Sequence, residues 1–212
     1  MKKLSLIFVM VLAVSFAMAQ KISTVNQYGS WNTASVYQYS TDGDQNSVYA
    51  LQQGNNNLLN STQIGVVFNN INYVELTQTG VDNDAYMVQT GLAYNTAKVT
   101  QSALSSYNYA AVDQTGYYNY SEIAQSGFLN RAELDQTASV YGQGTATSVS
   151  TQNGTSNTLD ILQDNNAASQ TATSTQNGLN NNTKVRQEGN GAQTVTDNQY
   201  GNDDIIIEQI GL

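Results

Sequence analysis

The side chains of this sequence that could do acid–base chemistry are its carboxylates, because histidine and cysteine are both absent. Acidic residues lie close together in four pairs: Asp42/Asp44, Asp82/Asp84, Glu133/Asp135 and Asp203/Asp204. Paired carboxyl groups could serve a glycosidase, and Asp82-Asn83-Asp84 could hold Ca²⁺ weakly. However, the glycine–aspartate nonapeptide of calcium-loaded β-rolls is missing, and acidic residues at turns and on outward faces are usually solvated. We therefore expect no enzymatic activity, no cofactor and no metal site.

The carboxamides are far more regular than the carboxylates, and their chemistry is hydrogen bonding. Glutamine recurs in two interleaved series with a period of about 25 residues, which is typical of repeat proteins. The first series is Gln27, Gln52, Gln78, Gln101, Gln125, Gln152, Gln176 and Gln199, and the second is Gln38, Gln63, Gln89, Gln114, Gln136, Gln163, Gln187 and Gln209. One glutamine from each series defines a repeat, so the chain contains eight repeats.

The residues before each glutamine alternate as a β-strand requires. In Asn95-x-Ala97-x-Val99-x-Gln101, for example, every second residue points to the same face. Of the 32 positions two and four residues before a glutamine, 24 are Val, Ile, Leu, Met or Ala and only one, Asp197, is charged. The interleaved positions carry thirteen charges in 48. Because an unpaired buried charge is very costly, the glutamine face is the buried one.

A constant turn joins the two strands of each repeat, with the pattern Gln-x-Gly-x-x-Asn. Its glycine, which suits a sharp reversal with positive φ, is Gly29, Gly54, Gly80, Gly127, Gly154, Gly178 or Gly201, and Ala103 stands in its place in the fourth repeat. Its asparagine is Asn32, Asn57, Asn83, Asn108, Asn130, Asn157 or Asn181, with Asp203 in the eighth repeat. The fourth turn is two residues longer, but the strand pattern resumes in phase at Asn108.

These elements predict an all-β fold, a β-solenoid of eight strand–arc–strand repeats. Equivalent strands would stack about 4.8 Å apart into two parallel, in-register sheets, as in cross-β structures. A lone buried glutamine would leave donors and acceptors unpaired. Stacked on identical residues, however, each amide can bond the amides above and below it in a ladder.

The first residues have the pattern of an export signal. Lys2 and Lys3 precede the apolar run Leu4–Phe16, and Ala17-Met18-Ala19 fits a cleavage site, so we expect a cleaved signal peptide (residues 1–19) and a single domain over residues 20–212. The apolar run is too short for a permanent membrane anchor. The acidic balance, 16 acidic against 7 basic residues, argues against nucleic-acid partners.

The frame in residues 27–38, Gln-x-Gly-x-x-Asn-x-Ala-x-x-x-Gln, resembles the curlin repeat, and the resemblance extends over about residues 22–212. The curlin family supplies the subunits of curli, the extracellular functional amyloid fibres of bacterial biofilms. The resemblance implies a secreted subunit that polymerises into cell-surface fibres for biofilm matrix and adhesion. It also implies a homologous nucleator subunit and an outer-membrane export apparatus as partners.

Two features bear on whether the chain forms a polymer. No helix, proline or basic stretch blocks either end of the repeat array, whereas soluble solenoids need capping repeats. An open edge invites another chain, and a head-to-tail contact that does not close makes a filament. We therefore expect a major fibre subunit. The alternatives are the minor nucleator of the same fibre and a monomeric ice-binding or adhesive solenoid, suggested by Thr171, Thr173 and Thr175 on one outward face.

Overall fold

The structure, a computed structural model, describes residues 9–12, 20–40, 45–65, 71–138, 145–165 and 168–211. These residues form strands and short connecting arcs and contain no helix, and none of them forms a helix long and apolar enough to cross a membrane. The strands are β1 Val9–Leu12, β2 Gln20–Ser30, β3 Thr33–Tyr39, β4 Gln45–Asn55, β5 Leu58–Gly65, β6 Ile71–Val81, β7 Asp84–Ala93, β8 Asn95–Ser106, β9 Tyr109–Tyr117, β10 Tyr120–Phe128, β11 Arg131–Ala138, β12 Ala146–Thr155, β13 Thr158–Asn165, β14 Gln170–Leu179, β15 Asn182–Gly189, β16 Gln193–Gly201 and β17 Asp204–Ile210.

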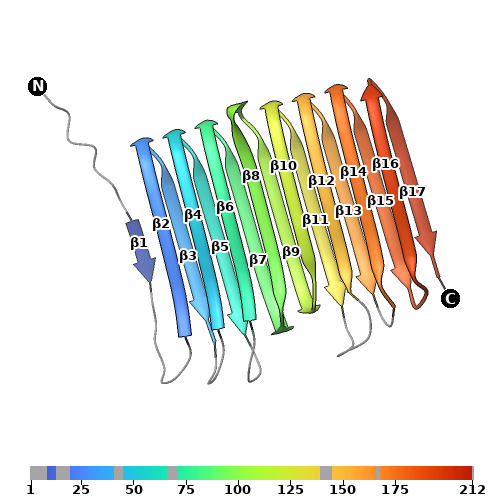
Figure 1. Cartoon of the computed structure of the whole chain (residues 1–212), viewed down its shortest axis with the longest axis horizontal. Coiled ribbons are helices and arrows are strands. Elements are labelled where there is room, and N and C mark those ends of the chain that lie inside the picture. Colours follow the sequence, from blue (N-terminus) through green and yellow to red (C-terminus); the bar gives the residue numbers. More distant parts are fainter. Residues whose placement is uncertain are drawn as a thin grey trace, which may run out of the picture.

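The strands alternate between two parallel sheets that face each other, and the repeats follow one another along the long axis (Figure 1). Sheet A has the order β1-β3-β5-β7-β9-β11-β13-β15-β17, and sheet B has the order β16-β14-β12-β10-β8-β6-β4-β2. Each glutamine lies directly beside the glutamine of the next repeat, as Gln125 does beside Gln152. The predicted β-solenoid of eight two-strand repeats is therefore confirmed, with β1 as an additional strand.

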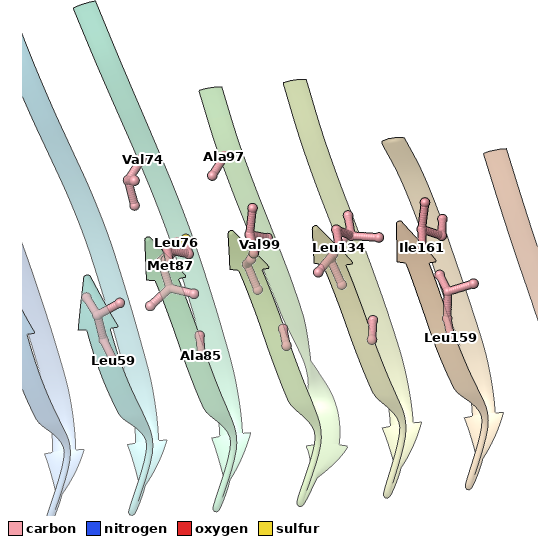
Figure 2. Close-up of a cluster of buried hydrophobic side chains, with 14 of the residues drawn as sticks. Leu59, Val74, Leu76, Ala85, Met87, Ala97, Val99, Leu134, Leu159 and Ile161 are labelled. Carbon is pink, nitrogen blue, oxygen red and sulfur yellow. The ribbon is translucent and has the colours of Figure 1, made fainter. Parts of the chain in front are cut away.

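The core is a thin layer of aliphatic side chains between the two sheets. Leu59, Val74, Leu76 and Met87 point into the space between the layers (Figure 2) and are at most 1% exposed. Full burial of a side chain of this size contributes about 1.5–3 kcal/mol. Strict alternation of buried with more exposed residues, as in β13, repeats along the strands. The face that carries the glutamines is the buried face, as the distribution of charges indicated.

The longer fourth repeat is accommodated within its arc. β8 is in register with β6 up to Gln101 opposite Gln78, and the register then shifts so that Ser105 lies opposite Gly80. A local bulge takes up extra residues while the paired strand keeps its inward and outward faces. The residue at the glycine's place in the stack is therefore Ser105, which corrects the assignment of Ala103.

Candidate functional site

The glutamines form two continuous hydrogen-bonded ladders, one in each sheet. In sheet B, from Gln27 to Gln199, the Nε2 of each glutamine donates to the Oε1 of the next at 2.7–3.0 Å. In sheet A, from Gln38 to Gln209, the same bonds measure 2.8–3.0 Å. All of these bonds run in one direction, from the earlier repeat to the later one. Gln27 and Gln209, at the two ends, are half-buried, and the other fourteen glutamines are buried.

Each ladder also ties the two sheets together across the core. Gln63 Nε2 donates to the backbone oxygen of Ser47 at 3.2 Å, and Gln89 Nε2 donates to that of Tyr73 at 3.0 Å. Gln52 reaches two facing strands, with bonds to Thr33 O in β3 and to Asn57 O just before β5. The glutamine side chains therefore hydrogen-bond to the backbone of the facing sheet as well as to each other, and each such bond contributes about 1 kcal/mol.

The arc asparagines form a third ladder, which runs in the opposite direction. The backbone N–H of each donates to the Oδ1 of the asparagine one repeat earlier at 2.8–3.2 Å, and Asp203 N–H donates to Asn181 Oδ1 in the same way. The Nδ2 group in turn bonds the arc glycine of the next repeat, as Asn57 Nδ2 does to Gly80 O at 3.2 Å. Asn32 is half-buried, and the other six asparagines are buried.

Six of the arcs that join the two strands of a repeat contain two residues with positive φ. One is the glycine, where a side chain would clash with the next repeat: a Cβ on Gly29 would lie 1.9 Å from Gly54 O. The other, which sequence reasoning missed, immediately precedes the asparagine and is not glycine, as at Trp31 (φ 62°) and Leu129 (φ 57°). This left-handed conformation costs a non-glycine residue roughly 1–2 kcal/mol. The left-handed conformation of this residue directs the side chain of the following asparagine inward, where it joins the asparagine ladder.

A fourth amide column was not among the predicted site residues. Asn72 Nδ2 donates to Asn46 Oδ1 at 3.1 Å, and Asn95 Nδ2 donates to Asn72 Oδ1 at 3.3 Å. Asn119 N–H continues the column to Asn95 Oδ1 at 3.1 Å. These residues lie six positions before the first glutamine of a repeat, so an extension of the two-residue alternation by one further step would have found them.

The carboxylate pairs of the described residues lie in the arcs and on the outer face of sheet A. No group of three or more acidic side chains that could hold a metal occurs among the described residues, and Asp42 and Asp44 lie outside them. Glu133 and Asp135 lie on the outer face of sheet A, where Asp135 is opposite Asp113. Burial raises the pKa of Asp113, and burial together with the charge of Asp113 raises the pKa of Asp135.

The outer face of sheet B carries a small array of threonines. Thr147, Thr171 and Thr194 lie side by side on β12, β14 and β16, and Thr173 lies beside Thr196. On the neighbouring strand β10, however, Tyr120 donates to Glu122 at 2.6 Å, a bond that raises the pKa of Tyr120 to about 12. The threonine array therefore covers only the last part of the stack.

At each end of the stack one strand projects beyond the facing sheet. β16 is an edge strand, but Gln199 bonds both Asn182 O in β15 and Asp203 O before β17, and it is 1% exposed. β17 faces β16 alone, and the inward side chains of Ile207 and Gln209 are only half-buried. At the other end, β1 is the outermost strand of sheet A, β2 is the edge strand of sheet B, and Gln27 is half-buried. Without β1, which belongs to the predicted signal peptide, β2 would project, and the two ends would then be stepped in complementary senses.

The comparisons with known proteins agree with this geometry. The family model of the curlin associated repeat matches residues 108–137, a segment that covers β9, β10 and nearly all of β11. No curated protein and no solved structure matches the chain. The matched segment holds Asn108, Gln114, Gln125, Asn130 and Gln136, the positions that recur in the other repeats as ladder residues. Residues 108–137 are thus similar to the curlin associated repeat, and the predicted resemblance to the curlin repeat family is confirmed in this segment.

Proposed function

We propose that this protein is a secreted structural subunit that polymerises head to tail into extracellular, curli-like amyloid fibres. These fibres contribute to biofilm matrix and adhesion. The observation that carries the proposal is the pair of exposed sheet ends: among the described residues, no further strand pairs with the outer edges of β2, β16 and β17. Edges of this kind, with unpaired backbone donors and acceptors, template the addition of another chain.

The route to the cell surface is part of the same proposal. Residues 1–19 act as a signal peptide that is removed after Ala19, and an outer-membrane apparatus exports the mature chain, residues 20–212. Apart from β1, residues 1–19 lie outside the described residues. A homologous minor subunit nucleates the fibre on the cell.

The role of major subunit is preferred to that of nucleator because the last repeat is regular. β17 pairs with β15 over its whole length, with Ile207 opposite Val185 and Gln209 opposite Gln187. A nucleator would be expected to carry a degenerate or basic final repeat. Here the last strand instead presents Ile205 and Ile207 toward the core position of a further repeat.

The test is assembly of the purified mature protein at neutral pH. We expect a lag phase, then thioflavin-positive fibres, and a shortened lag when sonicated fibres are added as seeds. Fibre diffraction should show a repeat of about 4.8 Å along the fibre axis. A protein that stays monomeric at tens of micromolar, as judged by sedimentation velocity, would contradict the proposal.

The array of Thr147, Thr171, Thr173, Thr194 and Thr196 supports one alternative, a monomeric ice-binding or adhesive solenoid. In that case the protein would stay monomeric and would lower the freezing point without lowering the melting point. Substitution of Thr173 by Lys would abolish that activity. If fibres form and Thr173→Lys leaves their growth unchanged, the threonines serve as ordinary strand residues, for which threonine has a high propensity.

A further inference from the structure

We propose that Tyr94 and Tyr118 form an oxidative modification site, at which hydrogen peroxide, acting through a haem peroxidase, couples the two phenol rings into a dityrosine. The new bond would join two links of the solenoid covalently within one molecule. Cysteine is absent from the chain, so a disulfide cannot make a link of this kind. The inference goes beyond the proposed function, because it concerns the monomer and requires no fibre.

The two tyrosines occupy equivalent places in the links that join one repeat to the next. Tyr94 lies between β7 and β8, and Tyr118 lies between β9 and β10. Each precedes a fully buried asparagine. Asn119 N–H donates to Asn95 Oδ1 at 3.1 Å, and Thr96 N–H donates to Asn119 O at 2.8 Å. These bonds hold the two links one above the other, so the tyrosines that precede the asparagines lie one repeat apart.

The rings of Tyr94 and Tyr118 are stacked. Their centroids are 5.2 Å apart and their planes differ by only 8°. Parallel rings in contact lie about 3.5–4.0 Å apart, so this centroid distance means that one ring is displaced sideways over the other, as in offset stacking. The displacement brings carbon atoms at the edges of the two rings together. Tyr94 is 45% exposed and Tyr118 is half-buried, so an oxidant can reach the pair.

The backbone of both residues is in a conformation that is unusual for tyrosine. The φ angle is 57° at Tyr94 and 54° at Tyr118, a left-handed region in which a bulky residue is a genuine outlier. Asparagine tolerates this region better and occupies it in the inner arcs at Asn56 and Asn180. Strained residues of this kind are often found at functional sites. The same strain at equivalent tyrosines in two links is therefore consistent with a role for the ring pair.

Two other close tyrosine pairs among the described residues are less suited to coupling. The rings of Tyr86 and Tyr109 are 5.5 Å apart and tilted by 35°, and the Arg131 guanidinium lies 5.3 Å from the Tyr109 centroid. The positive charge disfavours the loss of an electron from that ring. The rings of Tyr49 and Tyr73 are 5.8 Å apart and tilted by 40°. Burial also raises the pKa of Tyr73, which therefore loses its hydroxyl proton less readily.

In the reaction, each phenol loses one electron and its hydroxyl proton to the oxidant and becomes a phenoxyl radical. The two radicals form one C–C bond between ring carbons next to the oxygens. The hydrogen on each of these carbons then moves to the oxygen, which restores both phenols. Through the peroxidase, hydrogen peroxide accepts the two electrons and two protons, its O–O bond breaks, and two water molecules form. The product therefore lacks two hydrogen atoms.

The test is oxidation of dilute, freshly purified mature protein with hydrogen peroxide and a haem peroxidase. The monomer band of a denaturing gel is then digested with trypsin, so that links between molecules are not counted. Lys98 lies between the two tyrosines, and digestion separates residues 22–98 from residues 99–131 unless a bond joins them. We expect a joined peptide that is lighter than the sum of the two by two hydrogen atoms and that shows dityrosine fluorescence.

Conservative variants locate the bond. Tyr94→Phe and Tyr118→Phe keep the ring and remove the hydroxyl, and each should lose the joined peptide. Tyr86→Phe is the matched control, because Tyr86 and Tyr109 also lie on opposite sides of Lys98, and it should leave the yield nearly unchanged. If Tyr94→Phe keeps the wild-type yield, or if Tyr86→Phe loses the peptide, the proposed site is wrong.

A second measurement uses the wild-type chain alone. Oxidation in concentrated urea, where the rings are no longer stacked, should lower the yield of the joined peptide several-fold, with free N-acetyltyrosine in a parallel tube to show that the peroxidase is active. Equal yields from folded and unfolded protein, or no joined peptide from folded protein, would overturn the inference. The oxidised monomer should also unfold at a higher urea concentration than the unoxidised one, because a covalent link restricts the unfolded chain.

Discussion

Replacing Gln52 by alanine tests whether the amide ladders stabilise the fold. Gln52 Nε2 shares its protons among Thr33 O, Asn57 O and Gln78 Oε1, at 3.2, 3.1 and 2.8 Å, and Gln52 Oε1 accepts from Gln27 Nε2 at 2.7 Å. The variant therefore removes four hydrogen bonds. At about 1 kcal/mol for each bond, with a further cost for the cavity, the expected loss is about 3–5 kcal/mol in the free energy of unfolding.

The neighbouring residue provides the matched control, because Gln53 is exposed whereas Gln52 is 0% exposed. Gln53→Ala should change the free energy of unfolding by less than about 0.5 kcal/mol. The assay is urea unfolding of dilute, freshly purified monomer, followed by circular dichroism. Gln52→Met, which restores most of the volume but none of the hydrogen bonds, separates the two contributions. If Gln52→Ala costs less than about 1 kcal/mol, or no more than Gln53→Ala, the ladders do not hold the monomer together.

Three further predictions concern the arc strain, the acidic face and the growing end. Leu129→Asn should stabilise the monomer by about 1 kcal/mol in the same unfolding assay, because Leu129 is exposed and asparagine tolerates its left-handed conformation better; no gain would mean that the arc is not strained there. The raised pKa values of Asp113 and Asp135 contribute stability that is present below the ordinary carboxyl pKa and is lost as pH rises through the raised values. Acidification from neutral pH should therefore stabilise the fold slightly in urea melts, and the double variant Asp113→Asn/Asp135→Asn should flatten that part of the profile. Asp197→Asn should speed seeded elongation, because Asp197 is an inward carboxylate on the edge strand β16, and a further strand beside β16 would remove the solvent that remains near its charge, whereas the exposed Asp204→Asn should change it little; equal rates would refute the burial argument.

Asp197 shows which features of a residue the repeat pattern predicts and which it does not. The alternation placed it on the inward face, and the structure shows it 3% exposed, with its Oδ2 accepting from Thr183 Oγ1 at 2.6 Å and from Ser174 Oγ at 3.1 Å. The partners could not be identified from the sequence, because Thr183 belongs to the facing strand. Which residues face each other across the core depends on how the two sheets are offset.

The amide residues outside these turns show a second limit of prediction from the sequence. Asn95 and Asn119 stand in the same alternating pattern as the glutamines, and both are 0% exposed. They were not predicted as ladder residues, because the sequence analysis assigned ladders only to the glutamines and to the asparagines of the Gln-x-Gly-x-x-Asn turns. Between β9 and β10, however, Gly116 has a φ of 97° and Tyr118 a φ of 54°, so this link repeats the geometry of the inner arcs.

The period, the face that is buried and the parallel stacking follow from the sequence by itself, since these depend on local alternation and on the high cost of burying charge. The direction of each amide ladder, the second turn residue with positive φ and the stepped ends were decided only in the tertiary structure. The physical reason is that an amide has two chemically different ends, and the same column of glutamines can bond upward or downward. Packing against the carbonyls of the facing sheet selects one direction, and with it the difference between the two ends of the molecule.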